Sequence, residues 1–170
     1  MKESILNGKR ILAVDDESDV LLVLEDEILS SCPESKIDKA TSYETALNLL
    51  KSQNYDLVIL DIMGVRGFDL LDFAVKRDLP VAMLTAHALT PEALKQSFMM
   101  GARSYLPKEK LGEIIPFLED IFLEKDNLSG WGTLMKKLEG YLNARWGEYW
   151  QKKDERFWKE FGQKSAHIRL

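Results

Sequence analysis

Residues 57–61 are LVILD, four apolar side chains in a row followed by an aspartate. A short apolar run of this kind is typical of a strand that is buried on both faces of a parallel sheet. Arg10–Val14 (RILAV) has the same character and is followed by Asp15, Asp16 and Glu17. Two buried strands that end in acids predict a parallel α/β sheet whose functional residues collect beyond the carboxyl ends of the strands.

The chain up to about residue 125 continues this alternation of apolar runs and amphipathic stretches. Further strands are expected at Lys36–Ala40, Val81–Thr85 and 104–106. Helices are expected at 18–30, 41–50, 68–76, 90–101 and 111–123, and the TSYE sequence at 41–44 predicts a capping box. Five strand–helix repeats predict a five-stranded parallel sheet with helices on both faces.

Composition places the chain among globular proteins, with 45% hydrophobic and 30% charged residues. No apolar run approaches the roughly 20 residues of a membrane span, and the N-terminus lacks a secretory pattern, so we expect a cytoplasmic protein. The charge is uneven. Residues 1–130 hold 14 basic and 23 acidic side chains, net −9, whereas residues 131–170 hold 9 and 5, net +4. This asymmetry favours two segments with different roles.

Chemically active side chains follow four of the expected strands: Asp15 and Asp16, then Asp61, Thr85 and Lys108. Parallel packing brings these strand ends to one edge of the sheet. Clustered carboxylates raise one another's pKa unless a cation lies between them, and oxygen ligands suit a hard ion such as Mg²⁺. Asp61 is a candidate nucleophile for a phosphoryl group, with Mg²⁺ and Lys108 offsetting the charge on the transferring oxygens.

These motifs together resemble the receiver domain of two-component response regulators. The resemblance rests on VDDE at 14–17, LDIM at 60–63, LTA at 84–86 and YLPK at 105–108, and it runs from about Ile11 to Phe122. It implies a doubly wound, flavodoxin-like (βα)5 fold. It also implies that the chain is not an enzyme, apart from Mg²⁺-dependent self-phosphorylation and autodephosphorylation.

The resemblance further implies roles for individual residues. Asp61 would be the phosphoacceptor, supplied by a sensor histidine kinase or a phosphotransfer protein. Asp15, Asp16, Asp61 and the backbone carbonyl of Met63 would hold Mg²⁺. Lys108 would pair with the phosphorylated aspartate. Thr85 and Tyr105 fit the switch pair of the family, in which the hydroxyl turns toward the phosphoryl group and the aromatic ring moves inward.

The sequence departs from the family pattern in the loops around the site. The loop after Asp61 lacks the usual proline and is about two residues short, and Lys108 is followed by Glu109 in place of proline. A trans Lys108–Glu109 bond is therefore expected. Met63 and His87 occupy the positions that tune dephosphorylation in the family, although a plain surface role is favoured for His87.

The division expected from the sequence is a receiver at 1–125 and a helical extension at 126–170 that is rich in Trp and basic residues. Turn formers at 126–132 predict a break, followed by one long helix bent near Gly147 or by two shorter helices. Its aromatic stripe must be covered. Packing on its own receiver or on a second copy is favoured over docking to a partner protein. No helix-turn-helix pattern is visible, so we expect no DNA-binding domain here.

Three functions are compatible with these residues. The first is a phosphorylated receiver that signals through changed protein–protein contacts at the face formed by the fourth helix, fifth strand and fifth helix. The second is a pseudo-receiver that acts as a structural or dimerisation module without phosphorylation. The third is a Mg²⁺-dependent phosphatase, which would need an acid where the chain has Met63.

Overall fold

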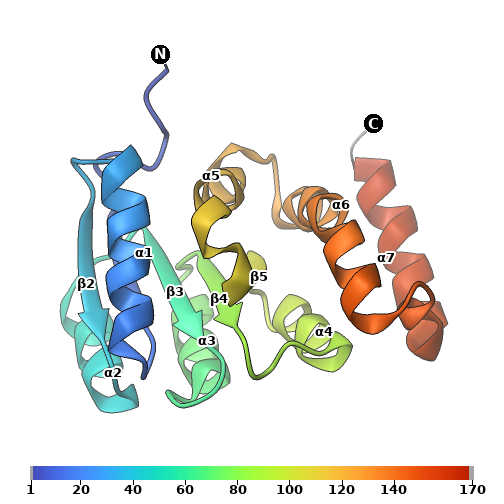
Figure 1. The fold of residues 1–170 in the computed structure, drawn as a ribbon, viewed down its shortest axis with the longest axis horizontal. Helices are drawn as coiled ribbons and strands as arrows, with labels where there is room; N and C mark the ends of the chain where they lie inside the picture. Colours follow the sequence, from blue (N-terminus) through green and yellow to red (C-terminus); the bar gives the residue numbers. More distant parts are fainter. Residues whose placement is uncertain (1, 169–170) are drawn as a thin grey trace.

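The computed structural model describes residues 2–168, with side chains described as far as Ser165. Five strands alternate with helices in the first part of the chain, and two further helices follow (Figure 1). The strands are β1 (Arg10–Val14), β2 (Lys36–Ala40), β3 (Leu57–Asp61), β4 (Val81–Thr85) and β5 (Ser104–Pro107). The helices are α1 (Ser18–Ser31), α2 (Tyr43–Ser52), α3 (Gly67–Lys76), α4 (Pro91–Met99), α5 (Ile114–Leu123), α6 (Asn127–Trp146) and α7 (Glu155–Ile168).

All neighbouring strands are parallel, in the order β2-β1-β3-β4-β5. This is the strand order of flavodoxin-like doubly wound sheets, as predicted. Helices α1 and α5 lie on one face of the sheet and α2 and α3 on the other (Figure 1). Every residue of the apolar strands β3 and β4 is buried, because helices cover both faces of the sheet.

The register aligns the carboxyl ends of the strands. Val14 lies beside Leu60, Asp61 beside Leu84, and Thr85 beside Pro107. The residues that follow β1, β3, β4 and β5 therefore come to one edge of the sheet, where the sequence predicted the functional side chains.

Several helix starts differ from the sequence prediction. The N-cap of α2 is Ser42, one residue after the start of the predicted capping box, and its hydroxyl accepts from the Thr45 N–H at 3.2 Å. Residues Lys108–Glu113 form a 3-10 helix, so α5 begins at Ile114 rather than at 111. This start leaves Pro116 in the first helical turn, where its missing N–H needs no partner.

The predicted break at 126–132 is wrong. The carboxylate of Asp126 caps a helix by accepting from the Ser129 N–H at 2.8 Å, and α6 begins directly after it. The turn formers in this stretch are thus the first residues of a helix. Gly147, with φ of 90°, ends α6, so the two-helix alternative is the one observed. A short 3-10 helix, Trp150–Asp154, connects α6 to α7.

The extension packs on the receiver of its own chain. Helix α6 lies against α5, α4 and β5, and α7 packs on the outer side of α6 (Figure 1). The Trp131 side chain is fully buried, and its indole N–H donates to the Ala102 carbonyl at 2.7 Å. The ring of Phe98 on α4 contacts Trp131, Phe157 and Phe161 edge-on. One hydrophobic core therefore runs from the sheet into the extension.

This packing covers the face formed by α4, β5 and α5, which the sequence analysis took as the output surface. The boundary at residue 125 stays a prediction, since the core continues across it. Among the described residues, none of the helices has the length and apolar character that crossing a membrane requires.

Candidate functional site

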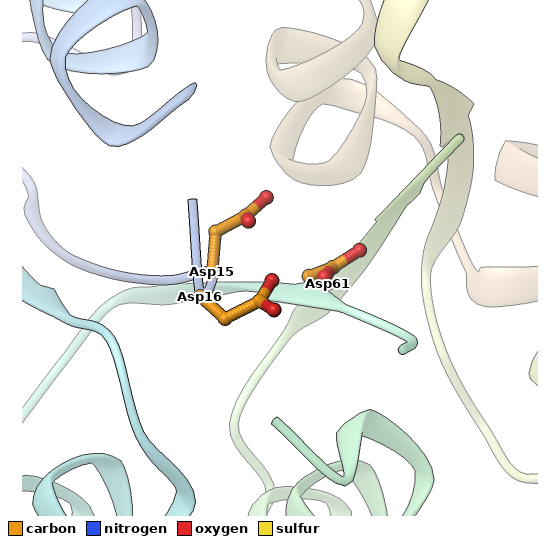
Figure 2. Close-up of side chains that lie close together, drawn as sticks. All are labelled: Asp15, Asp16 and Asp61. Carbon is orange, nitrogen blue, oxygen red and sulfur yellow. The ribbon is translucent and has the colours of Figure 1, made fainter. Parts of the chain in front are cut away.

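Three aspartates meet at the carboxyl edge of the sheet. Asp15 and Asp16 follow β1 and Asp61 ends β3, and their carboxylates project into a shared space (Figure 2). One oxygen from each lies within 4.8 Å of the others. Asp15 and Asp61 are 1% and 3% exposed, whereas Asp16 is exposed to solvent. The cluster combines two desolvated carboxylates with one that opens to water.

Lys108 is the cation that faces this cluster. Its Nζ lies 2.9 Å from Asp15 Oδ2, 3.3 Å from Glu17 Oε1 and 3.5 Å from Asp61 Oδ1. The lysine side chain is 9% exposed, so it is held between the acids rather than extended into water. One ammonium pairs with three carboxylates, and Asp16 adds a fourth acid to the cluster, so the site keeps a net negative charge.

The electrostatics follow from this arrangement. Burial, and secondly the charge of Asp15, raises the pKa of Asp61 to about 7, although Lys108 opposes the shift. Burial also raises the pKa of Asp15. For Lys108, burial lowers the pKa, but the hydrogen bond to Asp15 and the charge of Asp61 outweigh it, and the net direction is upward. An added cation would relieve the repulsion between the acids.

The donor set fits a divalent metal ion. Asp15 Oδ2 is buried, and it faces the Lys108 ammonium at 2.9 Å. A buried carboxylate oxygen of this kind gains from further coordination by a metal ion. Three carboxylates without nitrogen or sulfur ligands select hard cations. The acidic cluster could therefore hold such an ion.

The loop after Asp61 is shaped by two glycines. Gly64 has φ of 87°, and a Cβ there would lie 2.5 Å from the Asp16 carboxylate. A Cβ on Gly67 would lie 2.1 Å from the Asp61 carbonyl oxygen. Gly67 requires glycine because its backbone lies against the backbone of Asp61, and Gly64 favours glycine because of its positive φ. The Met63 side chain is 53% exposed, and metal binding by its carbonyl stays a prediction.

Thr85 and Tyr105 are joined through the loop that follows β4, residues 86–90. Thr85 Oγ1 accepts from the Ala88 N–H at 2.9 Å. The Tyr105 hydroxyl donates to the Ala88 carbonyl at 2.7 Å and accepts from the Thr90 N–H at 3.2 Å. The Tyr105 ring is fully buried, and this burial raises the pKa of its hydroxyl. The ring is therefore inward, and the Thr85 hydroxyl is engaged with its own loop.

The structure brings together Asp15, Asp16, Asp61 and Lys108, as the sequence predicted. Thr85 ends the neighbouring strand, while His87 is exposed on the loop and its tuning role stays a prediction. The Lys108–Glu109 peptide bond is trans, as expected. Two contacts at the site were not predicted from the sequence: that of Glu17 with Lys108, and the close approach of Gly64 to Asp16. The acidic run at 15–17 was a sequence signal for the contact of Glu17. The short loop with two glycines was a signal for the approach of Gly64 to Asp16.

The fold and the site together define a doubly wound α/β protein with an acidic cluster paired to a lysine at the carboxyl edge of its sheet. Comparison with known families identifies the class more closely, because the profile of the response regulator receiver domain matches residues 11–117. This match covers more than half of the chain. The chain belongs to the response regulator receiver domain family, whose members are generally signalling modules.

Individual relatives agree with this assignment. The two-component response regulator ARR18 of Arabidopsis thaliana is 39% identical over 105 residues, which cover 59% of this chain and 16% of ARR18. The heme response regulator HssR of Staphylococcus aureus is 37% identical over 103 residues, 57% of this chain and 43% of HssR. The chain thus matches only a minor part of these longer proteins.

Solved structures show the same fold. The receiver domain of NtrX from Brucella abortus is 29% identical, with a TM-score of 0.59 over 68% of this chain and 99% of that domain. A Burkholderia pseudomallei response regulator, solved with a phosphorylated aspartic acid, a calcium ion and citrate, aligns with a TM-score of 0.61 at 19% identity. That alignment covers 74% of this chain and 72% of the other.

Proposed function

We propose that this protein accepts a phosphoryl group on Asp61 and signals through changed protein–protein contacts. The observation that carries the proposal is the placement of Lys108 Nζ between Asp61 and Asp15, at 3.5 and 2.9 Å. An ammonium at that point can pair with the oxygens of a phosphoryl group on Asp61. Membership of the receiver family supports the same function.

The donor would be a histidine kinase or a phosphotransfer protein carrying phosphohistidine. An Asp61 carboxylate oxygen attacks phosphorus, an O–P bond forms, the P–N bond breaks, and its electron pair returns to the imidazole nitrogen. Only the ionised carboxyl can attack. Lys108 favours that form and offsets charge on the phosphoryl oxygens as the transfer proceeds.

We propose Mg²⁺ as the ion of the acidic cluster, held by Asp15, Asp16, Asp61 and the Met63 carbonyl. When bound, Mg²⁺ would neutralise charge on the carboxylates and on the incoming phosphoryl oxygens. Asp16 is the exposed member of the set, so it offers the side from which the ion and its waters enter. The inward Tyr105 and the Thr85 hydroxyl would form the switch that reports phosphorylation.

The test is adduct formation. The protein is incubated with Mg²⁺ and acetyl phosphate, and the added phosphoryl group is sought by intact mass. Asp61→Asn is expected to abolish the adduct. Asp69→Asn is the matched control, because Asp69 is an exposed aspartate on α3 paired only with Arg66 among the described ion pairs. It should form the adduct as the unsubstituted protein does.

Two results would contradict the proposal. If the unsubstituted protein forms no adduct and does not bind beryllofluoride with Mg²⁺, the pseudo-receiver function is favoured. If it turns over an external phosphomonoester many times, the phosphatase function is favoured. The cytoplasmic location and a homodimer or partner contact through the C-terminal helices stay predictions from the sequence.

A further inference from the structure

The last two residues of α6 contact the loop after β4 and the 3-10 helix after β5, which both flank the acidic site. The Trp146 indole N–H donates to the Leu89 carbonyl at 3.1 Å, and Leu89 lies in the 86–90 loop after Thr85. Arg145 Nη1 lies 3.0 Å from Glu109 Oε1, and Glu109 directly follows Lys108. The helical extension therefore reaches the two segments that carry the phosphoryl-binding side chains.

The hydrogen bond from Trp146 completes the fixation of the 86–90 loop. Tyr105 already fixes the Ala88 carbonyl and the Thr90 N–H on either side of Leu89. With Trp146 on the intervening carbonyl, three consecutive loop residues are anchored. Two anchors come from β5 and one comes from the extension. The same loop holds Thr85 through the Ala88 N–H.

Of the two contacts, the one made by Trp146 is the stronger candidate for an energetic link. Arg145 and Glu109 are both largely exposed, and exposed ion pairs contribute little. The Trp146 side chain is half-buried, and its ring contacts Trp150 edge-on at 4.9 Å between centroids. Further anchoring of the segment after the loop comes from Lys95 on α4, which pairs with Asp154 and lies 4.5 Å from the Phe157 ring centroid.

We propose that Trp146 is a positioning residue for the phosphoryl site, which holds the 86–90 loop and so couples the helical extension to occupancy of Asp61. This inference rests on the proposed function. If the 86–90 loop is already ordered by Trp146, it loses less conformational entropy when Thr85 contacts a group bound at Asp61. The group at Asp61 is then bound more tightly. By reciprocity, a group bound at Asp61 strengthens the contact between Trp146 and the loop.

The experiment compares Trp146→Phe with Trp150→Phe in the full chain. Each removes one indole N–H and keeps a ring, but the Trp150 N–H donates to Asn143 Oδ1 within the extension, at 3.1 Å. The dissociation constant of beryllofluoride is measured by isothermal titration at saturating Mg²⁺. Trp146→Phe is expected to weaken binding about three- to tenfold. Trp150→Phe should stay within about twofold, even where it lowers the melting temperature as much.

A second measurement separates an effect on the loop from a general loss of stability in the variants, which would also change the affinity for beryllofluoride. Hydrogen exchange at the Ala88 and Thr90 amides should be faster in Trp146→Phe and unchanged in Trp150→Phe. Beryllofluoride should slow exchange at the Gly147 amide, which caps α6 by donating to the Asn143 carbonyl. Equal or tighter beryllofluoride binding by Trp146→Phe, or equal loop exchange, overturns the coupling. Absence of binding by the unsubstituted protein instead overturns the proposed function itself.

Discussion

At the scale of single residues, the ionisation of Asp61 is opposed by burial and by Asp15 and is favoured by Lys108. Its carboxyl is desolvated and faces Asp15, and both effects favour the neutral acid. Nucleophilic attack and metal binding both require the ionised form. Lys108 supplies part of the compensation from 3.5 Å, and a divalent ion would supply the rest. The ionisation of Asp61 therefore depends on which cation lies beside it.

The raised pKa of Asp61 predicts a pH-dependent affinity for Mg²⁺. With a pKa of about 7, most of the carboxyl is protonated at pH 6 and most is ionised at pH 8. Because protons compete with the metal, raising the pH over this range should tighten Mg²⁺ binding about tenfold. Isothermal titration at the two pH values measures the change. Equal affinities at pH 6 and pH 8 would show that Asp61 is ionised throughout.

Gly64→Ala should damage the metal site. The new Cβ would meet the Asp16 carboxylate at 2.5 Å, and φ of 87° is unfavourable for alanine. We expect a loss of about 1–3 kcal/mol of unfolding free energy together with weaker Mg²⁺ binding. Urea unfolding and metal titration would be measured side by side.

Gly140→Ala is the control for this change, because a Cβ at Gly140 meets nothing within 4 Å and the residue lies inside α6. It should leave Mg²⁺ binding unchanged and raise the unfolding free energy by about 0.5–1 kcal/mol. If the two variants bind Mg²⁺ equally well, the loop does not place Asp16.

The residues also show what a sequence can predict of such a site. Asp15, Asp16, Asp61 and Lys108 were predicted to meet because each follows a strand, and parallel strands share an edge. The pairing of Glu17 with Lys108 was not predictable, since it depends on the path of the chain after β1. Likewise, the close approach of Gly64 to the Asp16 carboxylate depends on the folded path of the loop, which no local pattern reveals.

At the scale of elements, Trp131 determines how α6 lies on the receiver. It is the largest of the fully buried side chains, and its N–H satisfies the Ala102 carbonyl just before β5. The ring also meets Phe98 of α4 edge-on, with centroids 5.3 Å apart. One side chain thus joins α6 to α4 and to the sheet.

Replacing Trp131 separates its packing from its hydrogen bond. Trp131→Ala should cost about 3–5 kcal/mol of unfolding free energy, because it removes a whole buried ring. Trp131→Phe keeps most of the apolar surface but leaves the Ala102 carbonyl without this donor, and should cost about 1–3 kcal/mol. Chemical denaturation followed by circular dichroism measures both. A cost below about 1 kcal/mol for the alanine variant would contradict the buried position.

The strands and the five receiver helices were predictable because their signals are local: apolar runs, turn residues and helical spacing. The start of α6 was not, because glycine, serine and asparagine at 127–132 favour turns as isolated residues. The Asp126 cap and the burial of Trp131 override that preference. The sequence showed an aromatic stripe on the extension, but it did not show which surface the stripe would cover.

At the scale of the whole molecule, the position of the tryptophans provides a test of cooperativity. All four, at 131, 146, 150 and 158, lie in the extension, and the single cysteine, Cys32, is buried at the end of α1 in the receiver. Tryptophan fluorescence therefore reports on the extension, and thiol alkylation reports on the receiver.

Because one core joins both parts, we expect them to unfold in one transition. The urea midpoint from tryptophan fluorescence should coincide with the midpoint from Cys32 reactivity. Circular dichroism on the same samples provides the reference for the whole chain. Loss of the fluorescence signal at clearly lower urea would show that the extension detaches first, and would place the boundary near residue 125.

The extension lies on α4, β5 and α5 as a segment tethered to the surface it covers. A tethered segment acts as if it were present at a local concentration on the order of millimolar. A second copy or another protein that binds this surface must therefore displace the extension, which stays attached to the same chain. The proposed phosphorylation of Asp61 would regulate such an exchange by shifting a competition inside one molecule, without creating a new binding surface.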